Sequence, residues 1–143
     1  MRVTSNNVEN EMAIIDFLIV DDSDAFVKLT KRTLHKSKLE CTVREASNGK
    51  FALDMLSERA NCPAVILLDM NMPVMNGFEF LDQYIGEGRC TDNTLIYMLT
   101  SSSMEQDKMR AGAYPQIKAY FEKPLTAQNI EQIIADLKAQ GAV

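Results

Sequence analysis

Cysteine and histidine are both scarce in this sequence of 143 residues. The three cysteines, Cys41, Cys62 and Cys90, are widely separated and form no CxxC pair. Such spacing indicates neither a disulfide framework nor a cysteine-based metal site, so we expect free thiols in a reducing compartment. The single histidine, His35, falls in a predicted helix and is interpreted as a structural residue.

Long hydrophobic runs are also missing. No apolar stretch approaches the roughly 20 residues that are needed to cross a bilayer. The N-terminus lacks the basic start and the apolar core of a secretory signal. Residues 1–13 are polar, rich in asparagine and aperiodic, and we interpret them as a flexible leader. We therefore expect a cytoplasmic protein without membrane insertion.

Basic residues are outnumbered by acidic ones, 15 to 20, and the formal net charge is -5. Direct nucleic-acid binding is not expected, because phosphate backbones favour clustered Lys and Arg. One basic stretch is interpreted first as a solvated helix face and, alternatively, as a docking surface for an acidic partner. It contains Lys28, Lys31, Arg32, Lys36 and Lys38.

Short apolar runs alternate with helical patterns from residue 14 onward. Three runs, IIDFLIV, AVILL and TLIYML, are almost continuously apolar, which is typical of strands buried on both faces of a parallel sheet. The predicted strands are Ile14–Val20, Cys41–Ala46, Ala64–Leu68, Thr94–Leu99 and Ile117–Phe121.

Helical spacing fills the segments between and after these strands. The last helix is the clearest, because its apolar residues recur at i, i+3, i+4 and i+7 after Thr126 as a cap. The predicted helices are marked by Phe26, Leu29 and Leu34 after the cap Ser23, by Ala52, Leu53 and Leu56, by Phe78, Leu81 and Ile85, by Met104–Ala111, and by Ile130, Ile133, Ile134 and Leu137. Five strands alternating with five helices predict one α/β domain over residues 14–140, with a doubly wound parallel sheet.

Polar residues follow four of the predicted strands. Parallel strands end at one edge of a sheet, and ligands bind in the crevice there. Three carboxylates, a hydroxyl group and an ammonium group should therefore meet in one shallow pocket. They belong to Asp21 and Asp22 after the first strand, Asp69 after the third, Thr100 after the fourth and Lys123 after the fifth.

This set of groups favours phosphoryl chemistry. Carboxylates that lie close together repel one another unless a cation sits among them. Mg2+ suits a site that has few carboxylates and retained waters. Such an ion would let an anionic phosphoryl group approach an aspartate, which can act as a nucleophile and form an acyl phosphate. The Lys123 ammonium and the Thr100 hydroxyl would donate to the phosphoryl oxygens.

Four segments of the chain resemble the receiver domain of two-component response regulators of the CheY type. They are LIVDDS (18–23), VILLDMNMPVMNGFEF (65–80), MLTSSS (98–103) and YFEKPLT (120–126). The resemblance extends from about residue 14 to residue 140. It implies a flavodoxin-like (βα)5 fold with the five-stranded sheet order 2-1-3-4-5 that is known for the chemotaxis member of the family.

The resemblance also assigns roles at the metal position. Asp69 is similar to the phosphoacceptor, which is also a metal ligand. Asp22 resembles the acid that binds Mg2+ directly, and Asp21 the acid that acts through water. Asn71 would offer its backbone carbonyl to the ion.

Further roles, at the phosphoryl position and in the switch, follow from the resemblance. Lys123 would pair with the phosphoryl group, and Pro124 is implied to aim it through a cis peptide bond. Thr100 would move toward the phosphate, and Tyr120 would follow inward as the aromatic half of a switch. Apart from the resemblance, the residues of the loop after the third strand indicate that Gly77 permits a turn before the following helix.

The implied function is that of a single-domain response regulator. A sensor histidine kinase would donate the phosphoryl group in a Mg2+-dependent reaction, and phosphorylation would change binding to an effector protein or promote homodimerisation. Only self-phosphorylation and self-dephosphorylation are expected as catalytic activities. The alternative is a phosphorelay shuttle that passes the group to a histidine phosphotransfer protein.

Two other functional classes fit the residues less well, and the chain departs from the family at one place. A haloacid-dehalogenase-type hydrolase would need a second acid at position 71, which is Asn71. A flavin-binding protein of the flavodoxin type is rejected, because Asp21 and Asp22 would repel the flavin phosphate. Extra residues lie between Gly112 and Lys123, so the choice of partner at the last strand is left open. Packing, not metal binding, is expected of Met70, Met72 and Met75.

Overall fold

The computed structural model describes residues 14–57, 62–88, 93–101 and 114–141. The strands are β1 (Ile15–Val20), β2 (Cys41–Ala46), β3 (Val65–Asp69), β4 (Leu95–Thr100) and β5 (Ile117–Glu122), and the helices described are α2 (Asp24–Lys36), α3 (Gly49–Met55), α4 (Gly77–Glu87) and α6 (Ala127–Ala139). Each predicted strand agrees with the observed one to within one residue at either end. The predicted helix over 104–111 and the predicted leader over 1–13 lie outside the described residues.

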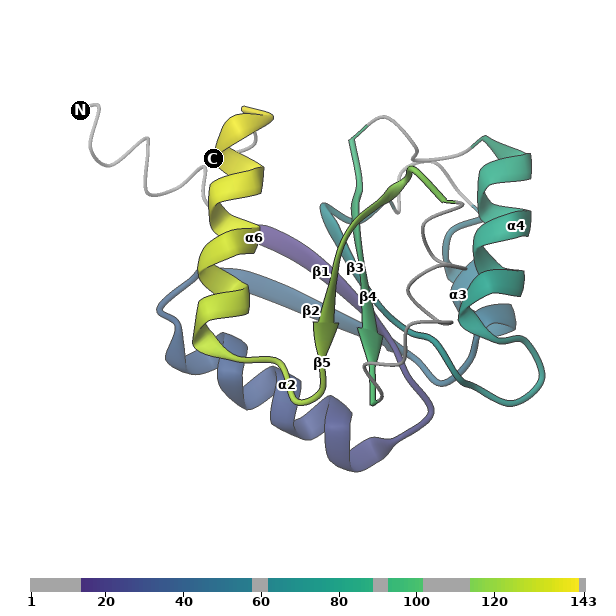
Figure 1. Cartoon of the computed structure of the whole chain (residues 1–143), viewed down its shortest axis with the longest axis horizontal. Coiled ribbons are helices and arrows are strands. Elements are labelled where there is room, and N and C mark those ends of the chain that lie inside the picture. Colours follow the sequence, from purple (N-terminus) through teal and green to yellow (C-terminus); the bar gives the residue numbers. More distant parts are fainter. Residues whose placement is uncertain (1–13, 58–61, 89–92, 102–113, 142–143) are drawn as a thin grey trace.

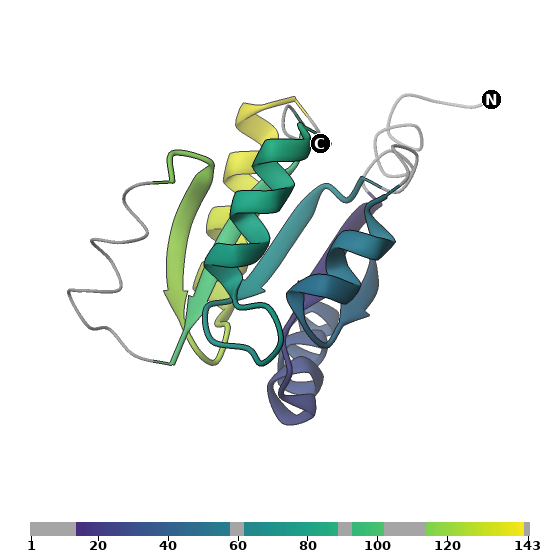
Figure 2. The ribbon, with the colours of Figure 1, turned by 90° about the vertical axis from the view of Figure 1, so that its right-hand side faces the viewer.

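The strands form one parallel sheet in the order β2-β1-β3-β4-β5 (Figure 1). This order confirms the predicted flavodoxin-like arrangement. Helices α2 and α6 cover one face of the sheet, and α3 and α4 cover the other; Figure 2 is viewed from the side of α3 and α4. All five strands run in the same direction, so their carboxyl ends lie along one edge.

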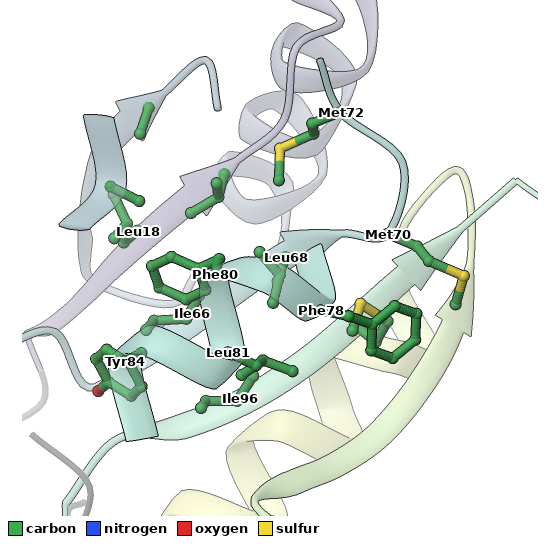
Figure 3. Close-up of a cluster of buried hydrophobic side chains, with 14 of the residues drawn as sticks. Leu18, Ile66, Leu68, Met70, Met72, Phe78, Phe80, Leu81, Tyr84 and Ile96 are labelled. Atoms are coloured by element: carbon green, nitrogen blue, oxygen red, sulfur yellow. The ribbon is translucent and has the colours of Figure 1, made fainter. Parts of the chain in front are cut away.

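Two hydrophobic clusters hold the helices against the sheet. The α3–α4 cluster contains Leu18, Val20, Ala46, Ala52, Leu56, Ile66, Leu68, Met70, Met72, Phe78, Phe80, Leu81, Tyr84, Ile96 and Met98 (Figure 3). The α2–α6 cluster contains Ile15, Phe17, Ile19, Val27, Leu34, Val65, Leu67, Tyr97, Leu99, Phe121, Leu125, Ile130, Ile133 and Leu137. The apolar residues of β1 and β3 alternate between the clusters, which explains why these strands are almost continuously apolar.

Capping side chains fix where the helices begin. The Ser23 hydroxyl accepts from the backbone N–H of Phe26, and Thr126 forms a reciprocal capping box with Asn129. Both caps were predicted from the sequence. Asn76, which was not, caps α4 in the same way. These helices therefore start at fixed points immediately after the loops that carry the polar strand-end residues.

The cysteine prediction is correct for Cys41 and wrong for Cys62. Cys41 is a free thiol, whereas Cys62 is disulfide-bonded. Cys62 precedes β3, and the loops that enter neighbouring parallel strands share one edge of the sheet. Residues that are distant in the sequence meet at such an edge, which spacing along the chain does not show. Among the described residues, no helix is long and apolar enough to span a bilayer.

Candidate functional site

A buried ammonium group lies between two buried carboxylates at the carboxyl edge of the sheet. Lys123 Nζ is 2.8 Å from Asp21 Oδ2 and 3.2 Å from Asp69 Oδ1. The three side chains are 6%, 2% and 7% exposed, so both ion pairs are shielded from solvent. Asp21 follows β1, Asp69 ends β3 and Lys123 follows β5. The parallel sheet therefore brings three distant segments together, as the sequence predicted.

A third carboxylate completes an acidic trio. One oxygen from each of Asp21, Asp22 and Asp69 can be chosen so that all three lie within 4.8 Å of one another. Asp21 and Asp69 are buried, and Asp22 is exposed at the rim. Three carboxylates and the Lys123 ammonium give the site a formal charge of -2 when all are ionised. Hard oxygen ligands with excess negative charge fit a divalent cation such as Mg2+.

Backbone donors hold the two buried carboxylates in place. Ser23 N–H donates to Asp21 Oδ1 over 2.8 Å, and Asn71 N–H donates to Asp69 Oδ1 over 3.4 Å. Each donor lies two residues after its acceptor, so both acids form short local loops directly after their strands. The orientation of the carboxylates is thus fixed by the chain itself.

Asp69 is the acid whose ionisation is most affected by this environment. Burial raises the pKa of Asp69, and the nearby charge of Asp21 raises it further, to about 6 from the ordinary 3.8. Lys123 and the Asn71 N–H lower the pKa but do not cancel these effects. Additional positive charge beside Asp69 would therefore favour its ionised form and lower its pKa.

The loop after β3 is fixed by close backbone contacts. Met70 N–H donates to the Leu99 carbonyl over 3.1 Å, and Gly77 N–H donates to the Met70 carbonyl over 3.0 Å. A Cβ atom on Gly77 would lie 2.6 Å from the Asp69 carbonyl oxygen. Gly77 stands where the chain leaves this loop and enters α4, as expected, but it does not have a positive φ. Glycine is required here because α4 starts against the backbone of Asp69.

The loop after β5 places the ammonium group. Lys123 N–H donates to the Thr100 carbonyl over 2.8 Å, which ties the end of β5 to the end of β4. The peptide bond between Lys123 and Pro124 is cis, as the family resemblance implied. Lys123 Nζ also lies 4.5 Å from the centroid of the Phe26 ring, a contact that the sequence analysis did not identify.

Comparison with known proteins decides the family of this chain. A family model for the response regulator receiver domain matches residues 17–135. The chain belongs to the response regulator receiver family. This receiver is 29% identical over 127 residues to a chemotaxis protein CheY homolog of Campylobacter jejuni, with 87% of this chain and 93% of the relative covered.

Two further relatives support the assignment. A solved response regulator receiver protein from Dyadobacter fermentans is 34% identical with a TM-score of 0.74, and the match covers 89% of this chain and 97% of that one. The sensor histidine kinase CheAY of Helicobacter pylori is 27% identical over 140 residues, which are 96% of this chain and 17% of the kinase. The receiver therefore resembles separate regulators over nearly their whole length and a kinase over one part.

The two predicted switch residues of the receiver lie on the neighbouring strands β4 and β5. Thr100 ends β4 and is 4% exposed. Tyr120 lies in β5, opposite Met98 of β4. Its side chain is half-buried and packs against the α3–α4 cluster. The receiver buries Met70 and Met72 in that same cluster, so their interpretation as packing residues is confirmed.

Phe26 is the residue near the site that sequence reasoning missed. It was used only as a marker of helical spacing in the first turn of α2. Its position four residues after Asp22 places it beside the strand-end loop, but spacing within one helix does not show what a side chain contacts across the sheet edge. The contact with Lys123 becomes visible only in three dimensions.

Proposed function

We propose that this receiver accepts a phosphoryl group on Asp69 from a sensor histidine kinase, in a reaction that requires Mg2+, and then changes its affinity for a partner protein. The observation that best supports the proposal is the Lys123 ammonium held between Asp21 and Asp69 beside a third carboxylate. A buried site with this charge distribution suits an incoming dianionic phosphoryl group together with a divalent cation.

The ion would be held by the carboxylates of Asp22 and Asp69 and the backbone carbonyl of Asn71, with Asp21 acting through water. When bound, Mg2+ supplies positive charge that offsets repulsion between the carboxylates and the phosphoryl oxygens. An Asp69 carboxylate oxygen forms a bond to phosphorus, and the bond from phosphorus to the donor breaks, with its electron pair leaving on the donor atom. Lys123 and Thr100 donate to the phosphoryl oxygens during this transfer.

The site of phosphorylation can be tested without a kinase. We expect Mg2+ and phosphoramidate to add the mass of one phosphoryl group to the protein, and peptide mass analysis to locate it on Asp69. Asp69→Asn should abolish the addition, because an amide is not a nucleophile of this kind. Omission of Mg2+ should have nearly the same effect. Phosphate on another residue, or undiminished labelling of Asp69→Asn, would contradict the proposal.

The output of the receiver is proposed to be a change in protein binding. Phosphorylation would favour one of two existing conformations, through movement of Thr100 toward the phosphate and of Tyr120 inward. The surface that binds the partner would include β5 and α6. The receiver would act in the cytoplasm. Equal affinity of a partner for the protein with and without Mg2+ and beryllofluoride, a phosphoryl mimic, would contradict this switch.

A shuttle role uses the same site and is distinguished by one experiment. If the receiver is a phosphorelay intermediate, label on Asp69 should move to a histidine phosphotransfer protein faster than it is lost to water. If it is a terminal switch, the label should be lost to water while partner binding changes. The similarity to part of the sensor histidine kinase CheAY supports a kinase as the donor in either case.

A further inference from the structure

The ammonium group of Lys123 has neighbours of two chemical kinds. Asp21 and Asp69 provide carboxylate oxygens at 2.8 and 3.2 Å. The face of the Phe26 ring lies 4.5 Å from Nζ, well within the range of about 6 Å for cation–π attraction. Only 6% of the lysine side chain remains exposed. The ring therefore helps to enclose a cation that is already paired with two acids.

Packing of the hydrophobic core does not account for Phe26. The side chain is only partly buried, and it belongs neither to the α3–α4 cluster nor to the α2–α6 cluster. The partly buried side chains that pack against these clusters do not include it either. A large aromatic residue outside the core, with a buried cation over its face, indicates a role in the site.

Local structure fixes the ring beside the acids. Phe26 lies in the first turn of α2, and its backbone N–H is held by the Ser23 hydroxyl over 3.4 Å. Ser23 also donates its own N–H to Asp21 Oδ1 over 2.8 Å. The same short segment thus orients one carboxylate partner of Lys123 and the ring that faces the ammonium.

We infer that Phe26 is a positioning residue for Lys123. The negative face of the ring holds the ammonium between the two buried acids and excludes water from it, so that the cation is already in place when a phosphoryl group is bound. An aliphatic side chain of similar size would fill the space but would not attract the cation. This inference rests on the proposed function of Asp69 as the phosphoacceptor.

The inference is tested with three variants of the full chain. Phe26→Leu removes the ring, Phe26→Tyr retains it, and Phe51→Leu makes the same change at an exposed phenylalanine on α3 that serves as the matched control. Binding of beryllofluoride in the presence of Mg2+ is measured by NMR titration. The proton shifts of the Lys123 ε-methylene are recorded in the absence of both, because a ring face shifts nearby protons upfield.

We expect Phe26→Leu to weaken beryllofluoride binding by about two- to tenfold, the range that a partly shielded cation–π contact provides. The upfield shift of the Lys123 protons should be lost in the same variant. Phe26→Tyr should restore both properties, and Phe51→Leu should resemble the wild type. Unchanged binding in Phe26→Leu, or failure of Phe26→Tyr to restore it, would overturn the inference.

Failure of the proposed function would look different. In that case the wild-type protein itself would not bind beryllofluoride with Mg2+, before any variant is compared. The upfield shift at Lys123 reports the ring contact independently of phosphoryl binding. A wild-type protein that binds beryllofluoride but shows no ring shift at Lys123 would overturn the role of Phe26 alone.

Discussion

At Asp69, burial and the carboxylate of Asp21 both oppose ionisation, and the pKa rises to about 6. The folded protein therefore binds this proton more tightly than the unfolded chain, whose pKa is close to 3.8. Stability contributed by the site should fall as the pH rises from about 4 to about 6, and should then stay level. Without Mg2+ at neutral pH, the folded protein thus carries an unfavourable charge at the position that is proposed to react.

Asp69→Asn should accordingly stabilise the protein that lacks Mg2+. We expect the free energy of unfolding near pH 7.5 to rise by about 1–3 kcal/mol, because the amide keeps the size of the side chain and removes its charge. The gain should disappear below about pH 3, where Asp69 is protonated in both the folded and the unfolded state. Urea denaturation at the two pH values measures it. The exposed Asp54→Asn on α3 is the control, and an equal gain in both variants would contradict the electrostatic explanation.

At the scale of elements, the beginning of α4 against the end of β3 sets the geometry of the site. Gly77 approaches the Asp69 backbone so closely that a Cβ would meet the carbonyl oxygen at 2.6 Å and Met70 Cα at 3.2 Å. The sequence showed that a glycine stands before the helical pattern, but not why. Contact between two backbones leaves no periodic signal in a sequence, whereas buried strands and capped helices do.

Gly77→Ala should therefore push α4 away from β3. We expect a loss of about 1–3 kcal/mol in the free energy of unfolding, the usual cost of overpacking in a dense interior. Gly86→Ala is the matched control on the same helix, because a Cβ there meets nothing within 4 Å. It should leave stability unchanged or raise it by up to about 1 kcal/mol through helix propensity. Thermal unfolding of both variants decides the point, and equal effects would show that the close contact is unimportant.

At the scale of the whole molecule, most of the predicted site followed from the common direction of the parallel strands. Continuous apolar runs identified β1, β3 and β4, and residues that follow a strand had to reach the same edge. The order of the strands came from the family resemblance, because the alternation of strands and helices does not show which strands are neighbours in the sheet. Phe26 was missed because its contact with Lys123 joins two segments that no repeating pattern in the sequence links.

The net charge of the strand-end site should make Mg2+ a ligand that stabilises the whole fold. Binding to the folded state alone raises the free energy of unfolding by RT ln(1 + [Mg2+]/Kd), which is about 1.4 kcal/mol when the concentration is ten times Kd. We expect the melting temperature of the wild type to rise with Mg2+ and not with NaCl of equal ionic strength. Asp22→Asn should melt like the wild type without Mg2+, because Asp22 is exposed, and should lose most of the Mg2+-dependent rise. A full rise in Asp22→Asn would place the stabilising ion elsewhere on the surface, and the acidic trio would no longer explain it.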